Sequence, residues 1–174
     1  MYYGEIKNCD IANGLGVRVS LFVSGCTNHC KECFNKATWD FCYGKPFTNE
    51  TKKQILDLLS PSYIAGFSLL GGEPFEPKNQ EVLVDFLKEI KEKYPNKTIW
   101  AWTGFLFDLE LLKKGAYANT ENTLKMLSYI DVLVDGRFNI NLKDLRLKFR
   151  GSSNQRLIDV KKSLKDGKVV LFEL

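Results

Sequence analysis

The chain has very little histidine and no long apolar segment. Its 174 residues include one histidine, His29, which leaves a Ser-His-Asp or Cys-His nucleophile mechanism with little material. No apolar run approaches the roughly 20 residues that span a bilayer. Residues 1–10 are polar and lack the apolar core of a secretory signal peptide. We therefore expect a cytoplasmic protein with no membrane partner.

The chain also lacks a strong excess of charge of either sign. Lysine and arginine number 25 against 21 aspartate and glutamate, the formal net charge is +4, and the two signs are interleaved. No continuous basic tract marks a nucleic-acid surface, so we expect no nucleic-acid partner. With 44% hydrophobic residues, a chain of this length can bury one core, and we expect a single domain over residues 1–174.

The cysteines do not resemble the disulfide framework of a secreted protein. Three of the five are crowded into the motif Cys26-x3-Cys30-x2-Cys33. A closed zinc site uses four ligands, whereas three thiolates on one loop suit an iron–sulfur cube that keeps one iron for an exchangeable ligand. We expect Cys9 and Cys42 to be free, buried structural cysteines. The alternative is a non-catalytic zinc or iron–sulfur adaptor with Cys42 as fourth ligand, although its spacing from Cys33 is unlike that of common zinc pairs.

Predicted strands and helices alternate along the chain, which favours an α/β fold with parallel strands. Glycine or polar residues follow the predicted strand ends at 24, 70, 102 and 134. In parallel sheets the carboxyl ends of the strands are where ligands bind, so we expect a site along this rim. Thr48 is the expected cap of the first helix. The expected strands are 17–24, 64–70, 97–102 and 130–134, with an apolar segment at 169–174, and the expected helices are about 49–59, 81–94 and 119–128.

The cysteine motif follows the first predicted strand, and Gly71-Gly72-Glu73-Pro74 follows the second. This pair of motifs resembles the radical S-adenosylmethionine superfamily. Within it, the chain from about residue 5 to about residue 157 resembles the activases of anaerobic (class III) ribonucleotide reductase. The implied fold is a partial (βα) barrel of mostly parallel strands. The segments that narrow the resemblance are Asp10-x2-Asn13-Gly14-x-Gly16-x-Arg18, Trp102-Thr103-Gly104, Val134-Asp135-Gly136-Arg137-Phe138 and Arg150-Gly151-Ser152-Ser153-Asn154-Gln155-Arg156.

The resemblance implies an oxidoreductase with two cofactors, a 4Fe-4S cluster and S-adenosylmethionine. Cys26, Cys30 and Cys33 would hold three irons, and the methionyl amine and carboxylate would chelate the fourth. One electron from the reduced cluster would release a 5′-deoxyadenosyl radical, which would take a hydrogen atom from a backbone glycine of anaerobic ribonucleotide reductase. The implied electron donor is a flavodoxin or a ferredoxin. The cofactor carries the chemistry, while the protein orients it and excludes water.

An alternative within the same chemistry is an activase of another glycyl-radical enzyme, such as pyruvate formate-lyase. Those activases usually run longer and carry an aromatic residue just before the third cysteine. Here that position is Glu32, and Phe34 follows the cysteine. We therefore expect the adenine pocket to use backbone groups of residues 32–34, with Phe34 as a candidate wall.

The resemblance also assigns residues to the cofactor side of the site. Gly71 and Gly72 would let the backbone approach the ligand, because glycine has no Cβ. Glu73 would add negative charge near the methionyl ammonium. The implied cofactor-binding residues are Glu32, Cys33, Phe34, Gly71, Gly72, Glu73, Pro74, Thr103 and Asp135.

Two further segments are expected to face the protein substrate. Residues 10–18 would shape the opening where the target peptide enters, the alternative being a glycine-rich turn before a strand. The donor-rich loop 150–156 would bind the partner or the cofactor's carboxylate, the alternative being a capped surface loop. The residues assigned to this side are Asp10, Asn13, Gly14, Gly16, Arg18, Arg150, Ser152, Ser153, Asn154 and Gln155.

Overall fold

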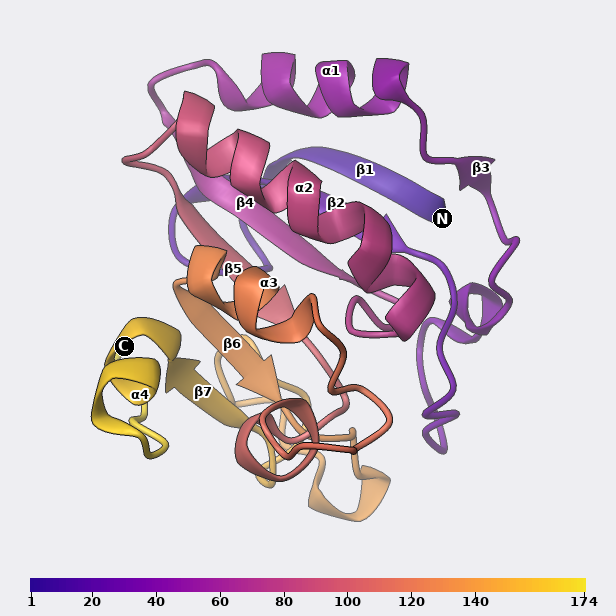
Figure 1. The fold of residues 1–174 in the computed structure, drawn as a ribbon. Helices are drawn as coiled ribbons and strands as arrows, with labels where there is room; N and C mark the ends of the chain where they lie inside the picture. Colours follow the sequence, from indigo (N-terminus) through magenta and orange to yellow (C-terminus); the bar gives the residue numbers. More distant parts are fainter.

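One mixed sheet of seven strands organises the protein, whose computed structural model describes residues 1–174 (Figure 1). The strands are β1 Tyr2–Asp10, β2 Val17–Val23, β3 Lys45–Pro46, β4 Ile64–Gly71, β5 Thr98–Trp102, β6 Val132–Asp135 and β7 Arg156–Asp159. The α-helices are α1 Asn49–Leu59, α2 Pro77–Lys93, α3 Thr123–Tyr129 and α4 Val160–Asp166. Short 3₁₀ helices span Lys36–Trp39 and Ile140–Leu142, and a π-helical turn spans Phe107–Leu111.

The four central strands run parallel, and the outer ones do not. The sheet order is β3-β1-β2-β4-β5-β6-β7. Strands β2, β4, β5 and β6 pair in parallel, whereas β1 pairs antiparallel with β2 and β3, and β7 pairs antiparallel with β6. The sheet is open, with β3 and β7 at its two ends. The expected α/β class is confirmed, and a partial barrel of the radical S-adenosylmethionine type stays a prediction.

Most expected elements are present near their predicted bounds. The four predicted strands correspond to β2, β4, β5 and β6, and the three predicted helices to α1, α2 and α3. Thr48 caps α1 as expected: its hydroxyl accepts from the Thr51 N–H, and the Thr51 hydroxyl accepts from the Thr48 N–H. Helix α2 begins at Pro77 rather than at 81, because proline suits the first turn of a helix, where its missing N–H would have no partner.

Other parts of the fold also differ from expectation, including β3 and β7, which were not predicted. Strand β1 was not predicted, because half-exposed residues along it blur the alternation that marks a strand. Helix α3 begins at Thr123 rather than 119, and the Thr120 N–H donates to the Thr123 hydroxyl in the turn that precedes it. The apolar end at 169–174 forms only an isolated bridge between Leu171 and Ile158.

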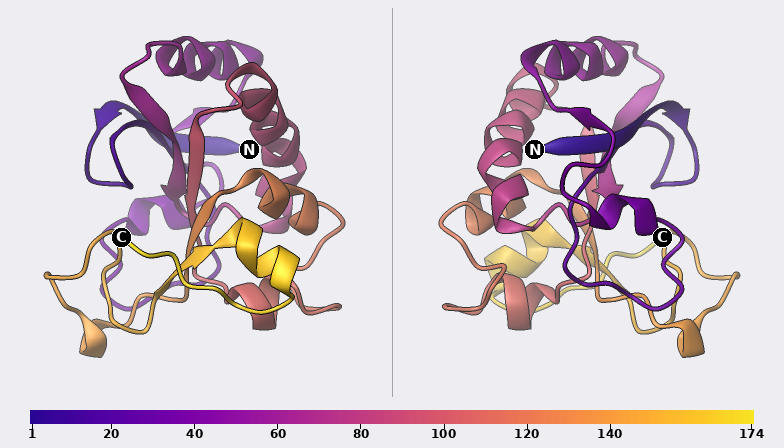
Figure 2. Two further views of the ribbon diagram at one scale, coloured as in Figure 1. Left: turned by 90° about the vertical axis from the view of Figure 1, so that its left-hand side faces the viewer. Right: turned by 90° about the vertical axis from the view of Figure 1, so that its right-hand side faces the viewer.

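Helices α1, α2 and α3 pack on one face of the sheet, over the larger apolar core (Figures 1 and 2). Alternate residues of the central strands belong to this core, including Val19 and Leu21 in β2 and Phe67 and Leu69 in β4. None of the helices is both long and apolar enough to cross a membrane. A smaller cluster comprises Trp100, Val132, Val134 and Leu157, with Trp102, Phe149 and Phe172 packed against it.

The parallel strands place the motif segments along one edge of the sheet. Strand β2 leads into the cysteine loop, β4 into Gly72 and Glu73, β5 into Thr103 and β6 into Gly136. The carboxyl ends of parallel strands lie at the same edge, which is the usual ligand edge of such sheets. The Gly72 N–H donates to the Val23 carbonyl at 2.7 Å, and this bond ties the ends of β4 and β2 together.

Candidate functional site

The loop after β2 presents three free thiols. Cys26 is buried, whereas Cys30 and Cys33 are half-buried. The Cys33 N–H donates to the Cys30 carbonyl at 3.1 Å, which closes a turn between them. His29 and Glu32 adopt positive φ angles of 46° and 59°, a left-handed backbone that non-glycine residues adopt only when the surrounding structure holds them. The cysteine loop therefore has a defined, tightly turned path.

The buried Cys26 thiol and the half-buried Cys30 thiol lie in surroundings that disfavour a bare thiolate. Burial raises the pKa of the Cys26 thiol to about 11, and the Glu73 carboxylate adds to the rise. Backbone N–H groups of Asn28 and His29 act in the opposite direction. Burial also raises the pKa of Cys30. Because cysteine binds metals as the thiolate, a cationic metal centre at the loop would offset this penalty.

Gly71 and Gly72 are required by the packing of the protein itself. Gly71 has a φ of 111°, and a Cβ there would lie 2.5 Å from the Val23 nitrogen. A Cβ on Gly72 would lie 2.6 Å from the Gly25 carbonyl oxygen and 2.8 Å from that of Thr38. The absent side chains thus let the end of β4 approach β2 and the cysteine loop. The expected approach of this backbone to a ligand stays a prediction.

Glu73 is buried and joins three segments of the site. One carboxylate oxygen accepts from the Thr103 hydroxyl at 2.8 Å and the Phe75 N–H at 2.9 Å. The other accepts from the Gly104 N–H at 2.7 Å and the Asn28 side-chain amide at 2.9 Å. Burial raises the pKa of Glu73 to about 7. Its side chain therefore binds protein donors on both oxygens, and Pro74 beside it is buried.

Asp135 has a similar internal role at the end of β6. It is fully buried, and it accepts from the Arg156 guanidinium at 2.9 Å and from the Phe107 N–H at 2.8 Å. Arg156 also reaches Asp108 at 2.8 Å. The expected place of Asp135 on the cofactor side is at the correct edge of the sheet, but its carboxylate already binds the protein.

The segment from Asp10 to Arg18 lies at the opposite edge. Arg18 stands near the start of β2 and is fully buried, so the expectation that it faces a protein substrate is wrong. Its donor groups all bind the protein, and burial lowers its pKa to about 10. The acceptors are Ser68 Oγ, Thr98 Oγ1 and the carbonyls of Leu15, Phe67 and Thr98, at 2.7–3.0 Å.

Asp10 and the glycines of this segment form the turn that was the alternative interpretation. The Asp10 carboxylate accepts from the Asn13 amide at 2.7 Å and from the Ser20 hydroxyl at 2.6 Å. Gly14 and Gly16 have φ angles of 111° and 78°, which suit glycine in a tight connection between strands. These residues connect β1 to β2 rather than reach the cysteine loop.

The 150–156 loop folds onto itself and onto the end of β6. The Gln155 amide oxygen accepts from the Ser152 N–H at 3.1 Å, and its NH₂ group donates to the Gly136 carbonyl at 3.0 Å. Arg150 donates to the Gln155 carbonyl at 2.6 Å. Ser152 is buried and Ser153 is exposed. Most of the expected donors are therefore engaged within the loop.

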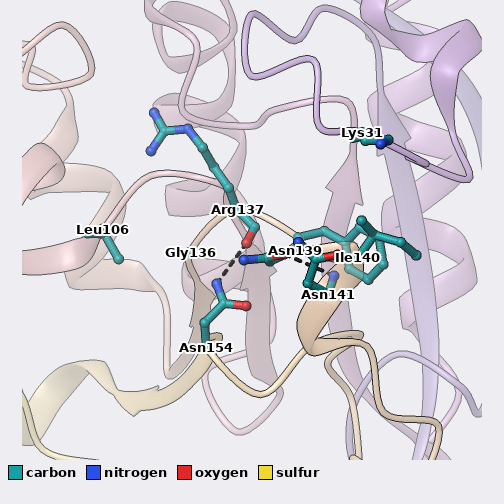
Figure 3. Close-up of a pocket in the computed structure, with 9 residues that line it drawn as sticks. Lys31, Leu106, Gly136, Arg137, Asn139, Ile140, Asn141 and Asn154 are labelled. Atoms are coloured by element: carbon teal, nitrogen blue, oxygen red, sulfur yellow. Dashed lines mark hydrogen bonds between the residues drawn. The ribbon is translucent and has the colours of Figure 1, made fainter.

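A cavity of about 450 Å³ lies between the cysteine loop and the segment after β6 (Figure 3). Asn154 is the one residue of the predicted partner-side set that lines it. Its amide donates to the Arg137 carbonyl at 2.9 Å, and the Arg137 guanidinium points away from Asn154 (Figure 3). That guanidinium donates to the Glu110 carboxylate at 2.8 Å. The lining residues are Lys31, Leu106, Gly136, Arg137, Phe138, Asn139, Ile140, Asn141 and Asn154.

Phe34 and two cysteines differ from what the sequence suggested. The Phe34 side chain is 92% exposed, so it forms no wall of a pocket in this structure, and Glu32 beside it is also exposed. Cys9 and Cys42 are free as expected, but both are exposed rather than buried. Cys9 lies between the polar residues Asn8 and Asp10 in β1, and Cys42 lies in the exposed loop after Trp39.

The residues of the cysteine loop fit an iron–sulfur cluster. Three soft thiolates are the usual donor set for such clusters. Two buried side-chain atoms have no hydrogen-bond partner: Asn28 Oδ1 within this loop, and Nε1 of Trp39, whose ring stacks on His29 of the loop. A bound group would offer them partners. No three His, Cys, Asp or Glu side chains converge on one point to hold a single metal ion. The thiolates of a cluster bind separate irons and do not need to converge.

Two residues of the site escaped the sequence analysis. Glu76 is fully buried and accepts from the backbone N–H and hydroxyl of Thr27, next to Cys26, and from the Tyr117 hydroxyl. An acid just before a helix ordinarily indicates nothing beyond the helix start, and no spacing linked residue 76 to the cysteine loop. Tyr117 lies in a loop without any motif.

Comparisons with known proteins match most of the chain. Residues 12–158 match the family model described as a 4Fe-4S single cluster domain. The chain is 43% identical over 157 residues to the anaerobic ribonucleoside-triphosphate reductase-activating protein of Enterobacteria phage T4. The aligned region covers 90% of this chain and 93% of that relative. Proteins of the same name from Pasteurella multocida (strain Pm70) and Escherichia coli (strain K12) are 43% and 41% identical, over 89% of this chain and over 95% and 96% of theirs.

Proposed function

Because this chain belongs to the family of anaerobic ribonucleoside-triphosphate reductase-activating proteins, we propose that it is a radical S-adenosylmethionine activase of anaerobic ribonucleotide reductase. It would take a hydrogen atom from a backbone glycine of that reductase and leave a glycyl radical there. The observation that carries the proposal is the loop of three free cysteines at the carboxyl edge of four parallel strands. A flavodoxin or ferredoxin would be the electron donor.

Cys26, Cys30 and Cys33 would each hold one iron of a 4Fe-4S cluster. When bound, the cluster would provide the electron that breaks the sulfonium carbon–sulfur bond of S-adenosylmethionine. Cys26 is fixed by its own backbone, because its N–H donates to the Trp39 carbonyl at 3.2 Å. The turn between Cys30 and Cys33 fixes the other two ligands relative to each other.

Backbone carbonyls at residues 71–73 would accept from the methionyl ammonium. The Glu73 side chain would support them from behind, since both of its oxygens bind donors of the protein. Through Thr103 and Gly104 it fixes the end of β5 relative to the end of β4. Glu73 would therefore hold the shape of the cofactor site and contribute a charge beneath it.

The cavity beside the cysteine loop would receive the glycine-bearing segment of the reductase. Asn139, Asn141 and Asn154 line it with side-chain amides, which both donate and accept hydrogen bonds. Such groups suit the backbone of an extended peptide, whose own N–H and carbonyl groups need partners when they leave water. Lys31 connects this cavity to the cysteine loop. The protein would then be a single domain whose sheet forms a partial barrel around this site.

The experiment that tests the partner uses two glycyl-radical enzymes side by side. Reconstituted protein, dithionite and S-adenosylmethionine are mixed anaerobically with anaerobic ribonucleotide reductase or with pyruvate formate-lyase. Electron paramagnetic resonance should show a glycyl doublet in the mixture that contains the reductase and none in the mixture that contains pyruvate formate-lyase. A doublet only with pyruvate formate-lyase would replace the partner and keep the chemistry. The absence of any doublet would contradict the proposed function.

A further inference from the structure

The first turn of α2 binds the chain on both sides of Cys26. The Asn79 side-chain amide donates to the Ser24 carbonyl at 3.0 Å, two residues before the cysteine. The Glu76 carboxylate accepts from the Thr27 N–H and from the Thr27 hydroxyl, both at 2.7 Å, directly after it. The backbone that carries Cys26 is therefore held by two buried side chains at the amino end of α2, Glu76 at its N-cap and Asn79 in its first turn.

Both carboxylate oxygens of Glu76 accept hydrogen bonds from the protein. One oxygen binds Thr27, and the other accepts from the Tyr117 hydroxyl at 2.7 Å. The side chain is fully buried. Its position before Pro77 places it at the positive end of α2, which stabilises a buried anion. Three hydrogen bonds and a helix terminus thus keep a negative charge close to Cys26.

We propose that Glu76 is a positioning residue for the cluster: it fixes the backbone after Cys26 and places a buried negative charge that lowers the reduction potential of the bound cluster. The proposal rests on the proposed function only in taking the three cysteines as cluster ligands. Adding an electron near a fixed anion is unfavourable, and nearby charge is one of the factors that set the potential of such clusters. Strong hydrogen bonds to a carboxylate fix geometry more firmly than neutral ones.

Two substitutions separate position from charge. Glu76→Gln removes the charge and keeps an oxygen that can accept from Thr27, although a neutral oxygen holds the Thr27 N–H less firmly. Glu76→Ala removes both. The matched control is Glu81→Gln, which neutralises an exposed acid one turn further along the same helix. Tyr117→Phe removes only the third hydrogen bond and leaves the exposed ring in place.

The first measurement is the exchange rate of the Thr27 amide hydrogen, followed by NMR in the cluster-free protein. Glu76→Ala should accelerate this exchange about tenfold or more, as loss of a hydrogen bond to a charged group predicts. Tyr117→Phe should accelerate it less, and Glu81→Gln should leave it unchanged. This reading needs no cofactor, reductase or turnover, so it stands even if the proposed function fails.

The second reading is the midpoint potential of the reconstituted cluster, from a spectroelectrochemical titration. Glu76→Gln should raise the midpoint at unchanged iron content, and Glu81→Gln should not. Should Glu76→Ala fail to fold, Glu76→Gln carries both readings, because a neutral acceptor holds the Thr27 N–H less firmly. Unchanged Thr27 exchange would overturn the positioning role. An unchanged midpoint in Glu76→Gln would overturn the electrostatic role.

Discussion

The Glu73 carboxylate accepts a hydrogen bond from the Thr103 hydroxyl at 2.8 Å, which joins the ends of the neighbouring strands β4 and β5. Its other oxygen binds the Gly104 N–H and the Asn28 amide, so the same acid also holds the cysteine loop. One buried side chain therefore fixes the relative positions of three segments at the carboxyl edge of the sheet.

This burial makes the stability of the cluster-free protein depend on pH. The pKa of Glu73 is raised from 4.5 to about 7, because burial disfavours its charge. The folded state therefore holds the proton more tightly than the unfolded state. The stabilisation that comes from protonated Glu73 in the folded state is fully present below about pH 4.5 and is lost as the pH rises to about 7.

Glu73→Gln should remove this pH dependence. The wild-type free energy of unfolding should fall between pH 5 and pH 8 because of Glu73, and that of the variant should not. The value for the variant minus that for the wild type should therefore increase by on the order of 1 to 3 kcal/mol over this range. Urea denaturation of the cluster-free proteins at several pH values measures the difference. The account of Glu73 is contradicted if the two unfolding curves keep a constant separation over that range.

Arg18 should matter for folding and not for the partner. Arg18→Met leaves buried carbonyls of Phe67 and Thr98 without their donors, and should lower the free energy of unfolding by about 2 to 4 kcal/mol. The control is Arg146→Met, at a side chain that is 90% exposed, which should change it by less than about 0.5 kcal/mol. Denaturant titration measures both, and equal effects would contradict the assignment.

Gly72 should be needed for retention of the cluster. A Cβ there would meet the Gly25 and Thr38 carbonyls, so Gly72→Ala should push the cysteine loop away from β4. Iron and sulfide content after anaerobic reconstitution should fall. Gly115→Ala is the control, because nothing lies within 4 Å of its Cβ position, and its iron content should equal that of the wild type. Equal iron content in both variants would show that the contact is dispensable.

Each cysteine of the motif should be essential, and the other two dispensable. Alanine at Cys26, Cys30 or Cys33 should abolish the visible absorption of the reconstituted cluster. Serine at Cys9 or Cys42 should leave it unchanged, since both thiols are exposed and stand outside the loop. Loss of the cluster in Cys42→Ser would favour a four-cysteine site instead.

The sequence predicted the parts of the site that depend on local spacing. The cysteine loop and the strand ends at 70, 102 and 134 follow from periodicity and from the parallel topology, which brings those ends to one edge. The position of Arg18 could not be predicted in the same way. Strand β1 escaped detection, so residues 10–18 were not recognised as the connection between β1 and β2, which lies at the amino edge.

Side-chain partners across long separations were the other part that the sequence could not provide. Glu76 and Thr27 are far apart in the chain, and Tyr117 lies on yet another loop. No periodicity links them, because their contact depends on how α2 packs beside the cysteine loop. The exposure of Phe34 likewise depends on the path of that loop, which turns at Glu32 with a positive φ.

The most direct test of the central claim measures release of 5′-deoxyadenosine. Anaerobically reconstituted protein is reduced with dithionite, given S-adenosylmethionine and analysed by chromatography, with Cys30→Ala as the matched control. The account predicts release by the wild type and none by the variant. A wild-type protein that holds a reducible 4Fe-4S cluster and releases no 5′-deoxyadenosine would contradict it.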